Sequence, residues 1–496
     1  MGLMTAEQYM KSIQDDRVVY LCGKLVEDIM ADPMLRTCIN TSAIDYEMAE
    51  MPEYRDLAVV TRGDGEAISR YYHTPESADD LLKRHELMVE ATRLGGGAIP
   101  FTHDIASDAI NAANIAATML GNEDYIRRVG GYQRFLQDND LSVAVAMTDV
   151  KGNRALRPSH PEQEHSDYYL RVVDRNAEGI VVRGAKAHIS AAAYFNEIFV
   201  IPCRNMSEQD ADYALAFAIP VNTKGIIQVA HPIKSDLGPL DFPVEGIPVH
   251  WHTDSLVIFD DVFVPWDRVF LCGEWQLAMP LVYNFAYYHR HTAASYRIPL
   301  SEMMVGMAQA MAEYNGVDKA SHIIEKITEL VIYVNMLKSL SRAACVDYVV
   351  HGGIPTPHPV ITNMAKYYFA SNFHRCVEIV QDVAGGLLST APSYQDFANP
   401  EIGALIEKYL GGRKGASAET RLRMLQLIRR LLVQEIEVLA VQGEGSFQAQ
   451  LMTIYLESQS EIQGYKAIVE REAGILPPLE VGGIFTSAAR SAGQAP

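Results

Sequence analysis

The sequence predicts an α+β protein, with an N-terminal helical domain and a C-terminal helical bundle on either side of a central β-barrel or β-sandwich domain. Helical periodicity dominates the first ~140 residues, and short β-branched and aromatic runs fill the next ~130. Helical periodicity then returns from about residue 281. We therefore expect domains over residues 1–139, 140–275 and 276–496.

Two amphipathic segments define the N-terminal domain. Ser77 precedes an acidic first turn and a stripe of apolar residues at helical spacing, which predicts a capped helix over 77–94. The glycine run 95–97 interrupts the pattern. Residues 104–120 place small apolar side chains at helical spacing and predict a second helix.

Seven strand-like runs follow between residues 141 and 270, separated by Gly, Pro, Asn and Asp. No spacer is long enough for a crossover helix, so we expect a barrel or sandwich rather than parallel βαβ units. The runs are LSVAVAMT, YYLRVV, GIVVRGAKAHIS, EIFVIP, ALAFAIPV, GIIQVA and SLVIFDDVFVP.

Long helical patterns make up the rest of the chain, and we expect them to pack antiparallel. Glycine-rich joints at 352–357 and 411–415 separate them. The helical patterns cover residues 281–298, 319–350, 360–386 and 420–442.

Charge and cysteine usage exclude several classes of function. The formal net charge of −20 repels phosphate backbones and anionic membrane surfaces, so neither nucleic acid nor membrane is an expected partner. The six cysteines show no C-x-x-C pair or metal-ligand spacing, which predicts no metal site and no disulfide scaffold. No apolar run reaches the ~18 residues of a membrane span, and we expect a cytoplasmic protein with reduced thiols.

Four short motifs at the edges of the β segment resemble those of the acyl-CoA dehydrogenase fold. Residues 146–149 with Gly152 resemble the A-[LM]-T-[ED]-P-x-x-G loop, which faces the pyrimidine edge of a flavin. Residues 184–190 resemble G-x-K-x-W-I-T, whose hydroxyl residue bonds the ring near N5. The run 259–265 resembles the F-x-x-V-x-V-P closing strand. The turn 381–386 resembles Q-x-x-G-G, which holds the adenosine and pyrophosphate end of the cofactor, usually in a neighbouring subunit.

A narrower resemblance covers nearly the whole chain, to the family that contains 4-hydroxyphenylacetate 3-monooxygenase and 4-hydroxybutyryl-CoA dehydratase. The opening run 9–20, the turn 31–33, the helix start SADDL and the run 151–154 carry it. The resemblance implies FAD as the cofactor and assigns a set of flavin contacts to this chain. These are Met147, Thr148, Lys151, Gly152, Asn153, Arg154, His188, Ile189, Ser190, Gly385, Gly386, Gly443, Gly445 and Ser446.

The chemistry of these segments supports flavin binding without the family. A Thr-Asp loop followed by Gly-Asn offers a hydroxyl and backbone N–H groups at a strand end, which suits the acceptor-rich edge of an isoalloxazine. Gly385 and Gly386 allow the backbone to approach a pyrophosphate closely. Each of these residues, taken alone, could equally serve only to make a turn.

The sequence lacks some of the residues that each of the two best-known members of the family requires. The dehydratase holds an iron–sulfur cluster through three Cys and one His. His289 matches the His, but residues 95–110 and 290–300 contain no Cys, so we expect no cluster. His289 could be catalytic or a hydrogen-bonded packing residue.

The phenol hydroxylase grips its substrate with an Arg, a Tyr and a His, whose positions match Phe101, Ile105 and Val145 here. We therefore expect Phe101 and Ile105 to form an apolar wall of the substrate site, which Val145 also contacts, with His103, Asp104 or His289 as possible polar contacts. His103 could instead belong to the core or the surface.

Residues 443–450 resemble the E-G-T-x-x-x-Q stretch of acyl-CoA dehydrogenases, in which the Glu removes a substrate proton. Glu444 falls on that position and, if buried beside a flavin, could be an effective base. In the narrower family the same turn mainly contacts FAD, so Glu444 could serve only to shape a glycine turn.

The sequence shows no strand-linked G-x-G-x-x-G site for a nicotinamide, which favours a separate flavin reductase. Our first hypothesis is the oxygenase component of a two-component, FADH2-dependent monooxygenase. It would use O2 to hydroxylate a small aromatic or heteroaromatic substrate. His289, Glu444 and Arg154 are its candidate catalytic residues. The expected assembly is a homotetramer.

Two alternatives remain open. One is a cluster-free flavin-dependent acyl-CoA dehydratase, isomerase or dehydrogenase that uses Glu444 or His289 as its base. The other is a flavin carrier or structural homologue without activity.

Overall fold

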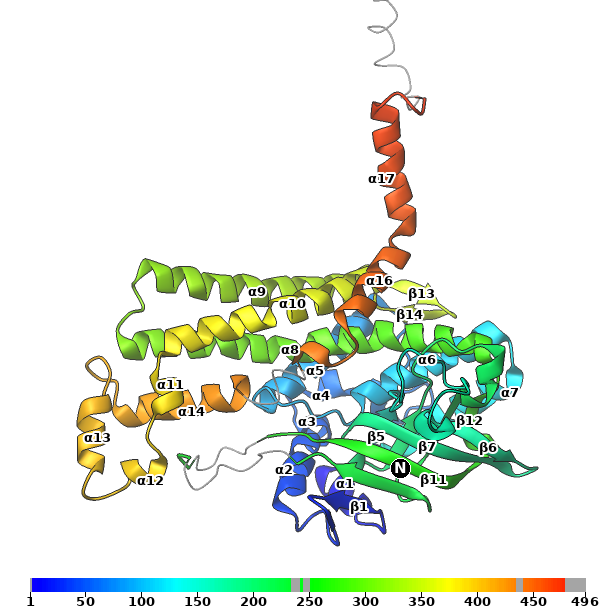
Figure 1. Ribbon diagram of the computed structural model, residues 1–496, viewed down its shortest axis with the longest axis horizontal. Coiled ribbons are helices and arrows are strands. Elements are labelled where there is room, and N and C mark those ends of the chain that lie inside the picture. The colour runs from blue at the N-terminus through cyan, green and yellow to red at the C-terminus, as the bar shows by residue number, and fades with distance from the viewer. Residues whose placement is uncertain (1, 233–240, 244–249, 434–439, 478–496) are drawn as a thin grey trace, which may run out of the picture.

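The protein has a layer of long helices above two β-sheets, with smaller helices beside the sheets (Figure 1). This computed structural model describes residues 2–232, 241–243, 250–433 and 440–477. Helices, then strands, then helices follow one another along the chain, and the predicted α+β class is confirmed. The exact domain limits stay predictions.

The N-terminal helices begin and end where local signals place them. The side chain of Ser77 accepts a hydrogen bond from the Asp80 N–H at the start of the first long helix, and Gly121 ends the second in a left-handed conformation. Both predicted helices are confirmed. The N-terminal helices are α1 (Ala6–Ser12), α2 (Pro33–Ser42), α3 (Ile44–Glu50), α4 (Arg55–Ala58), α5 (Ala78–Leu94), α6 (Asp104–Leu120) and α7 (Glu123–Asn139).

The central strands form two sheets that share one core. All seven predicted runs are strands, but the sheets stay open and do not close into a barrel. The six-stranded sheet has the order β2-β1-β10-β11-β7-β6, and the four-stranded sheet the order β12-β9-β8-β5. Their bounds are β1 (Val19–Leu21), β2 (Lys24–Leu25), β5 (Val143–Ala146), β6 (Arg171–Arg175), β7 (Gly179–Ser190), β8 (Glu197–Val200), β9 (Leu215–Pro220), β10 (Ile226–Ala230), β11 (Asp254–Pro265) and β12 (Val269–Cys272).

The N-terminal segment contributes to the larger sheet, which the sequence did not predict. β1 pairs in parallel with β10, with Val19 opposite Gln228. A strand of three residues is too short to show a period of two, so its pattern carries no signal. Strands β3 (Val59–Thr61) and β4 (Ala67–Ser69) form a separate hairpin.

Three long helices form the upper layer: α8 (Ala278–Asn315), α9 (Ser321–Val346) and α10 (Pro359–Ala384) lie side by side (Figure 1). The predicted joint at 352–357 is a hairpin of β13 (Val349–His351) and β14 (Ile354–Thr356). Part of the last predicted long helix, residues 434–439, lies outside the described residues. The remaining helices are α11 (Leu387–Thr390), α12 (Tyr394–Phe397), α13 (Gly403–Leu410), α14 (Ala418–Leu432), α16 (Phe447–Glu457) and α17 (Gln459–Glu472).

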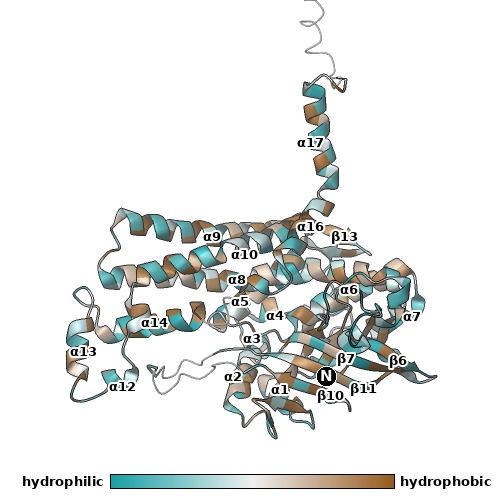
Figure 2. Ribbon diagram, in the orientation of Figure 1, coloured by the Kyte–Doolittle hydropathy of each residue, from teal (hydrophilic) through white to brown (hydrophobic). Residues whose placement is uncertain are grey.

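The C-terminal helix α17 projects away from the rest of the protein (Figure 1), and its ribbon contains hydrophobic as well as hydrophilic residues (Figure 2). Tyr465, Ile468 and Val469 on this helix are 61%, 57% and 67% exposed. Among the described helices, none is both long enough and apolar enough to cross a membrane.

Candidate active site and flavin-binding region

A buried ion pair holds the loop that follows β5. Lys186 on β7 and Asp149 in the loop are each 3% exposed, and the Lys186 Nζ lies 2.9 Å from an Asp149 carboxylate oxygen. The same ammonium donates to the carbonyl of Met147 (2.9 Å) and to that of Ile201 (3.0 Å). The other carboxylate oxygen of Asp149 accepts from the Leu170 N–H. The pair therefore ties the end of β5 to β7, β8 and β6.

The two segments assigned to the isoalloxazine lie side by side. The Ala187 N–H donates to the carbonyl of Thr148 at 2.8 Å, which joins the end of β5 to β7. Thr148 and Ser190 are half-buried, and neither hydroxyl bonds another group in the described part of the chain. Two free hydroxyls beside an accessible strand edge fit the polar edge of a flavin. Ile189 between them is buried, whereas His188 is exposed.

The loop after β5 continues outwards through the other predicted flavin contacts. Lys151 is half-buried, whereas Gly152, Asn153 and Arg154 are exposed. A Cβ at Gly152 would lie 2.2 Å from the ring of Tyr168, so only glycine fits there. Arg154 makes no hydrogen bond within the described residues, and none of their contacts joins it to His289 or Glu444.

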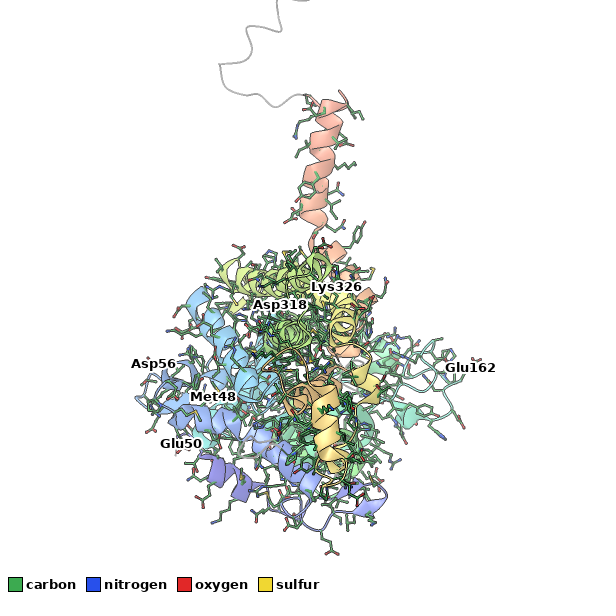
Figure 3. The ribbon with its side chains drawn as sticks, turned by 90° about the vertical axis from the view of Figure 1, so that its left-hand side faces the viewer. Met48, Glu50, Asp56, Glu162, Asp318 and Lys326 are labelled. Carbon is green, nitrogen blue, oxygen red and sulfur yellow. The ribbon has the colours of Figure 1, made fainter. Side chains whose placement is uncertain are left out.

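Further along this loop, the Gln163 side chain donates to the carbonyls of Lys151 (3.3 Å) and Asn153 (3.0 Å). These contacts hold the inner part of the loop in place. Glu162 beside it lies at the edge of the molecule, on the side opposite Asp56 (Figure 3).

Glu444 is buried in a polar corner between α8 and α10. Its side chain is 6% exposed, and one carboxylate oxygen accepts a short hydrogen bond from the Tyr296 hydroxyl. Lys366 lies 3.0 Å and Arg297 3.7 Å from the carboxylate. Burial alone would raise the pKa of Glu444, but Lys366, Arg297, His289 and the Tyr296 hydroxyl outweigh burial and hold it at about 2. Glu444 is therefore an ionised, paired carboxylate.

The turn around Glu444 is held by Arg290 of α8. Arg290 donates to the carbonyl of Glu444 (3.3 Å) and to the side chain of Asn363 (2.5 Å). Glu444 itself has φ of 60°, a left-handed conformation that costs free energy in a residue other than glycine. The neighbouring Gly445 and Ser446 are exposed and Gly443 is half-buried. The Ser446 hydroxyl accepts from the Ala449 N–H and caps α16.

His289 lies on α8 seven residues before Tyr296, which puts the two side chains on the same face of the helix. Its ring is 16% exposed, and Nδ1 lies 3.2 Å from a carboxylate oxygen of Asp108 on α6. When His289 is protonated its charge lowers the pKa of Glu444, so the two predicted catalytic residues share one electrostatic environment.

An aromatic wall adjoins this corner. The ring centroid of Phe101 lies 4.7 Å from that of His252 and 5.7 Å from that of Tyr296, both edge-on. Burial lowers the pKa of His252, so this imidazole is neutral. Ile105 and Val145 are half-buried against the neighbouring core of α6 and β5.

His103 points into the N-terminal domain, whereas Phe101 packs against Tyr296. His103 is 2% exposed, and its Nε2 lies 3.5 Å from the carboxylate of Asp140. Tyr46 and Tyr72 contact its ring edge-on, and burial lowers its pKa to about 3. The described contacts of His103 therefore place it in a buried cluster, away from Glu444.

Gly385 and Gly386 lie where α10 ends, directly before α11, and β5 lies toward the other end of the molecule (Figure 1). A Cβ at either glycine would meet no atom within 4 Å, so the backbone is open to an approaching group. Within one chain these two glycines and Thr148 do not form a single site.

Several residues of the site have no motif in the sequence. Lys366 and Arg297 are cations on otherwise apolar helical faces, which is the one signal that could have singled them out. Asp108 lies on a helix rich in alanine and isoleucine and carries the same signal. The described residues contain no group of three or more His, Cys, Asp or Glu side chains placed to hold a metal ion.

Comparison with known proteins identifies the family of this chain. Residues 5–271 match the family described as 4-hydroxyphenylacetate 3-hydroxylase N terminal, and residues 278–474 match its C-terminal counterpart. A 4-hydroxybutyryl-CoA dehydratase/vinylacetyl-CoA-Delta-isomerase from Clostridium aminobutyricum is 32% identical, covering 95% of this chain and 100% of that protein. The oxygenase component of 4-hydroxyphenylacetate 3-monooxygenase from Thermus thermophilus is 28% identical, covering 81% and 82%.

Solved structures of both kinds superpose on the chain. An oxygen-tolerant archaeal 4-hydroxybutyryl-CoA dehydratase from N. maritimus has a TM-score of 0.88 at 30% identity, covering 99% of each chain. An oxygenase component of 4-hydroxyphenylacetate 3-monooxygenase, complexed with FAD, has a TM-score of 0.85 at 25% identity, covering 95% of this chain and 99% of that one. The family predicted from the sequence is thus confirmed, and the chain belongs to the 4-hydroxyphenylacetate 3-hydroxylase family.

Proposed function

We propose that this protein is the oxygenase component of a two-component, FADH2-dependent monooxygenase that hydroxylates a small aromatic or heteroaromatic substrate. Its partners are O2 and a separate flavin reductase. The proposal draws on the family, on relatives that are oxygenase components, and on the site itself. A neighbour of the same fold is complexed with FAD, and the Thr148 and Ser190 hydroxyls are free to bond that cofactor.

The aromatic wall is the observation that carries the proposal. Phe101, His252 and Tyr296 meet edge to face in a buried aromatic cluster, and rings packed in this way suit contact with a planar substrate. The resemblance to the dehydratase would place two thiolate ligands at about residues 100–104. This segment contains no Cys, so the donor set does not fit an iron–sulfur cluster.

Glu444 supports the same conclusion through its charge. A general base works best when its pKa lies near the working pH, and a carboxyl with a pKa of about 2 is a weak acceptor of protons. Lys366 and Arg297 neutralise it in the ground state. We infer that Glu444 organises the corner and orients Tyr296 within the aromatic wall.

Different residues of this chain orient the flavin and enclose the substrate. Reduced flavin, when bound, supplies the electrons that activate O2. Thr148 and Ser190 orient the ring, and the ion pair of Lys186 with Asp149 keeps their strands together. Phe101, Ile105 and Val145 exclude water from the substrate side, which protects the reaction from hydrolytic loss. Arg154 remains a predicted polar contact.

Isotope transfer tests the proposal. The protein, a flavin reductase and a nicotinamide donor are incubated under 18O2 with a panel of phenols and N-heteroaromatics. We expect one labelled oxygen atom in a hydroxylated product, and no product when the reductase is left out. Turnover with oxidised FAD and no reductant would contradict the two-component proposal.

A second function has one specific observation in its favour. The dehydratase relative is 32% identical over almost the full length of both chains. A cluster-free flavin-dependent acyl-CoA dehydratase, isomerase or dehydrogenase would use Glu444 or His289 as its base. Conversion of 4-hydroxybutyryl-CoA or vinylacetyl-CoA without O2 and without a reductase would support it. Under this alternative, Glu444→Gln or a His289 variant abolishes the reaction.

We also propose that the protein is a homotetramer. The exposed apolar face of α17 contains Tyr465, Ile468 and Val469. Packing against another subunit would bury these side chains away from water. The open Gly385–Gly386 backbone lies apart from Thr148 within one chain, which suits a flavin shared between subunits. Light scattering should give about four times the mass of one chain, and a monomer would contradict the proposal. A cytoplasmic location stays a prediction.

A further inference from the structure

A buried carboxylate fixes the imidazole of His289. Asp108 on α6 is 0% exposed, and one of its oxygens lies 3.2 Å from the Nδ1 of His289. Phe285, one turn earlier on α8, stacks on a face of the ring, with 4.9 Å between the ring centroids. A carboxylate on one ring nitrogen and an aromatic face against the ring leave the imidazole little rotational freedom.

The second oxygen of Asp108 is held just as firmly. It accepts from the guanidinium of Arg84 on α5 at 2.5 Å and from the Thr292 hydroxyl on α8 at 3.0 Å. The Arg84 guanidinium also donates to the Ser107 hydroxyl and to the carbonyl of Asp104. Three helices therefore converge on one carboxylate, and its position does not depend on His289.

The other ring nitrogen faces away from this network. Nε2 of His289 makes no hydrogen bond with any described residue, and the side chain keeps 16% of its surface exposed. Asp104 lies beside Asp108, where burial and the Asp108 charge raise its pKa to about 6. Glu444 is the charged group toward the aromatic wall.

We propose that Asp108, clamped by Arg84 and Thr292, is a positioning residue that keeps the proton of His289 on Nδ1. A paired carboxylate only accepts hydrogen bonds, so Nδ1 must donate to Asp108 and the Nε2 lone pair is left for the active site. His289 then takes a proton from a reacting group on Nε2, and Asp108 stabilises the imidazolium that results. This proposal rests on the proposed function for the identity of the reacting group, but the tautomer does not.

A double-mutant cycle tests the coupling of the two residues. We expect Asp108→Asn to lower kcat by on the order of a hundredfold, the usual contribution of one acid–base group. The KM for the aromatic substrate and the Kd for FAD should change less than about threefold. Because Asp108 acts through His289, the double variant Asp108→Asn/His289→Gln should be no slower than His289→Gln. Losses that multiply in the double variant, or wild-type turnover in His289→Gln, would overturn the proposal.

If Asp108→Asn does not fold, Thr292→Val tests the hydrogen bonds that clamp Asp108. The substitution removes one of the two donors to the second Asp108 oxygen while Arg84 keeps its counterion. We expect a fall in kcat of about five- to tenfold with KM unchanged, roughly the effect of one lost hydrogen bond. Thr118→Val, on the exposed face of α6, is the matched control. Equal kcat in the two valine variants would overturn the proposal.

Nitrogen NMR determines the tautomer of His289 without any turnover. Its result therefore tests this proposal independently of the proposed function. Protein labelled with ring-15N histidine is measured in the solid state, well above the ordinary histidine pKa of about 6.5. The His289 signals are assigned by difference from His289→Gln. We expect a protonated Nδ1 and an unprotonated Nε2 in the wild type, and a mixture in Asp108→Asn. A proton on Nε2 in the wild type would overturn the proposal, whatever reaction the enzyme catalyses.

Discussion

The loop that follows β5, which carries predicted flavin contacts and is called the flavin loop below, should become less ordered when the ammonium of Lys186 is removed. Lys186→Met keeps most of the side-chain volume but leaves the buried Asp149 carboxylate and the carbonyls of Met147 and Ile201 without their donor. Breaking one side of a buried ion pair costs about 3–5 kcal/mol. A chain of 496 residues that unfolds as one unit has an unfolding entropy of about 1 kcal/mol/K. The thermal midpoint should therefore fall by about 3–5 °C.

Flavin affinity is the more specific readout of this change. Thr148 is joined to β7 next to the ion pair, so loss of the pair should let the Thr148 hydroxyl drift from its place. We expect the Kd for FAD, measured by fluorescence quenching, to rise by about tenfold, equivalent to about 1.4 kcal/mol. Lys224→Met, at an exposed lysine between β9 and β10, is the matched control. A Lys186→Met protein that keeps its thermal midpoint and its FAD affinity would refute the claim that this ion pair holds the flavin loop.

Three further variants test other parts of the structure. Ser190→Val removes one free hydroxyl and should weaken FAD binding about fivefold, the loss of one modest hydrogen bond; unchanged affinity would show that Ser190 does not face the flavin. Glu444→Gln leaves Lys366 and Arg297 without their carboxylate and should lower the thermal midpoint by about 3–5 °C; an unchanged midpoint would contradict the buried pairing. Burial raises the pKa of Asp140 from 3.8 to about 7, so its contribution to stability is complete below about pH 4 and is lost as the pH rises through 7. Asp140→Asn removes this titration. The thermal midpoint of the variant minus that of the wild type should therefore be higher at pH 8 than at pH 5; a difference that does not change with pH would exclude the raised pKa.

Local signals in the sequence were enough to place α5, α6 and the seven predicted strands. Ser77 caps α5 as predicted, and α6 has the predicted bounds because its apolar spacing and Gly121 define it without help from the rest of the fold. The joint at Gly352 is a hairpin instead of a bare loop, since two strands of three residues each are too short to show periodicity. The parallel pairing of β1 with β10 joins residues about 200 positions apart, and no local pattern reports such a contact.

The candidate site could be predicted only in part, because contacts between residues far apart in the chain leave no local pattern. Thr148 and Ser190 lie on the strand ends that their motifs indicate, because a motif is a local feature. The environment of Glu444 comes from Lys366 and Tyr296, which lie far away in the chain, so its lowered pKa could not be foreseen. His103 is two residues from Phe101, yet the start of α6 directs the two side chains to different clusters.

Rapid mixing of the FADH2-loaded protein with O2 tests the central claim most directly, because it needs no knowledge of the substrate. The absorbance of oxidised flavin is followed after mixing and compared with that of free FADH2 under the same conditions. An oxygenase component should delay the return of this absorbance, since its site protects the oxygen-activating step from water. Ser190→Val should shorten the delay. If the oxidised absorbance returns as fast as in free solution, the protein is not the oxygenase that its family, its free flavin-facing hydroxyls and its aromatic wall lead us to propose.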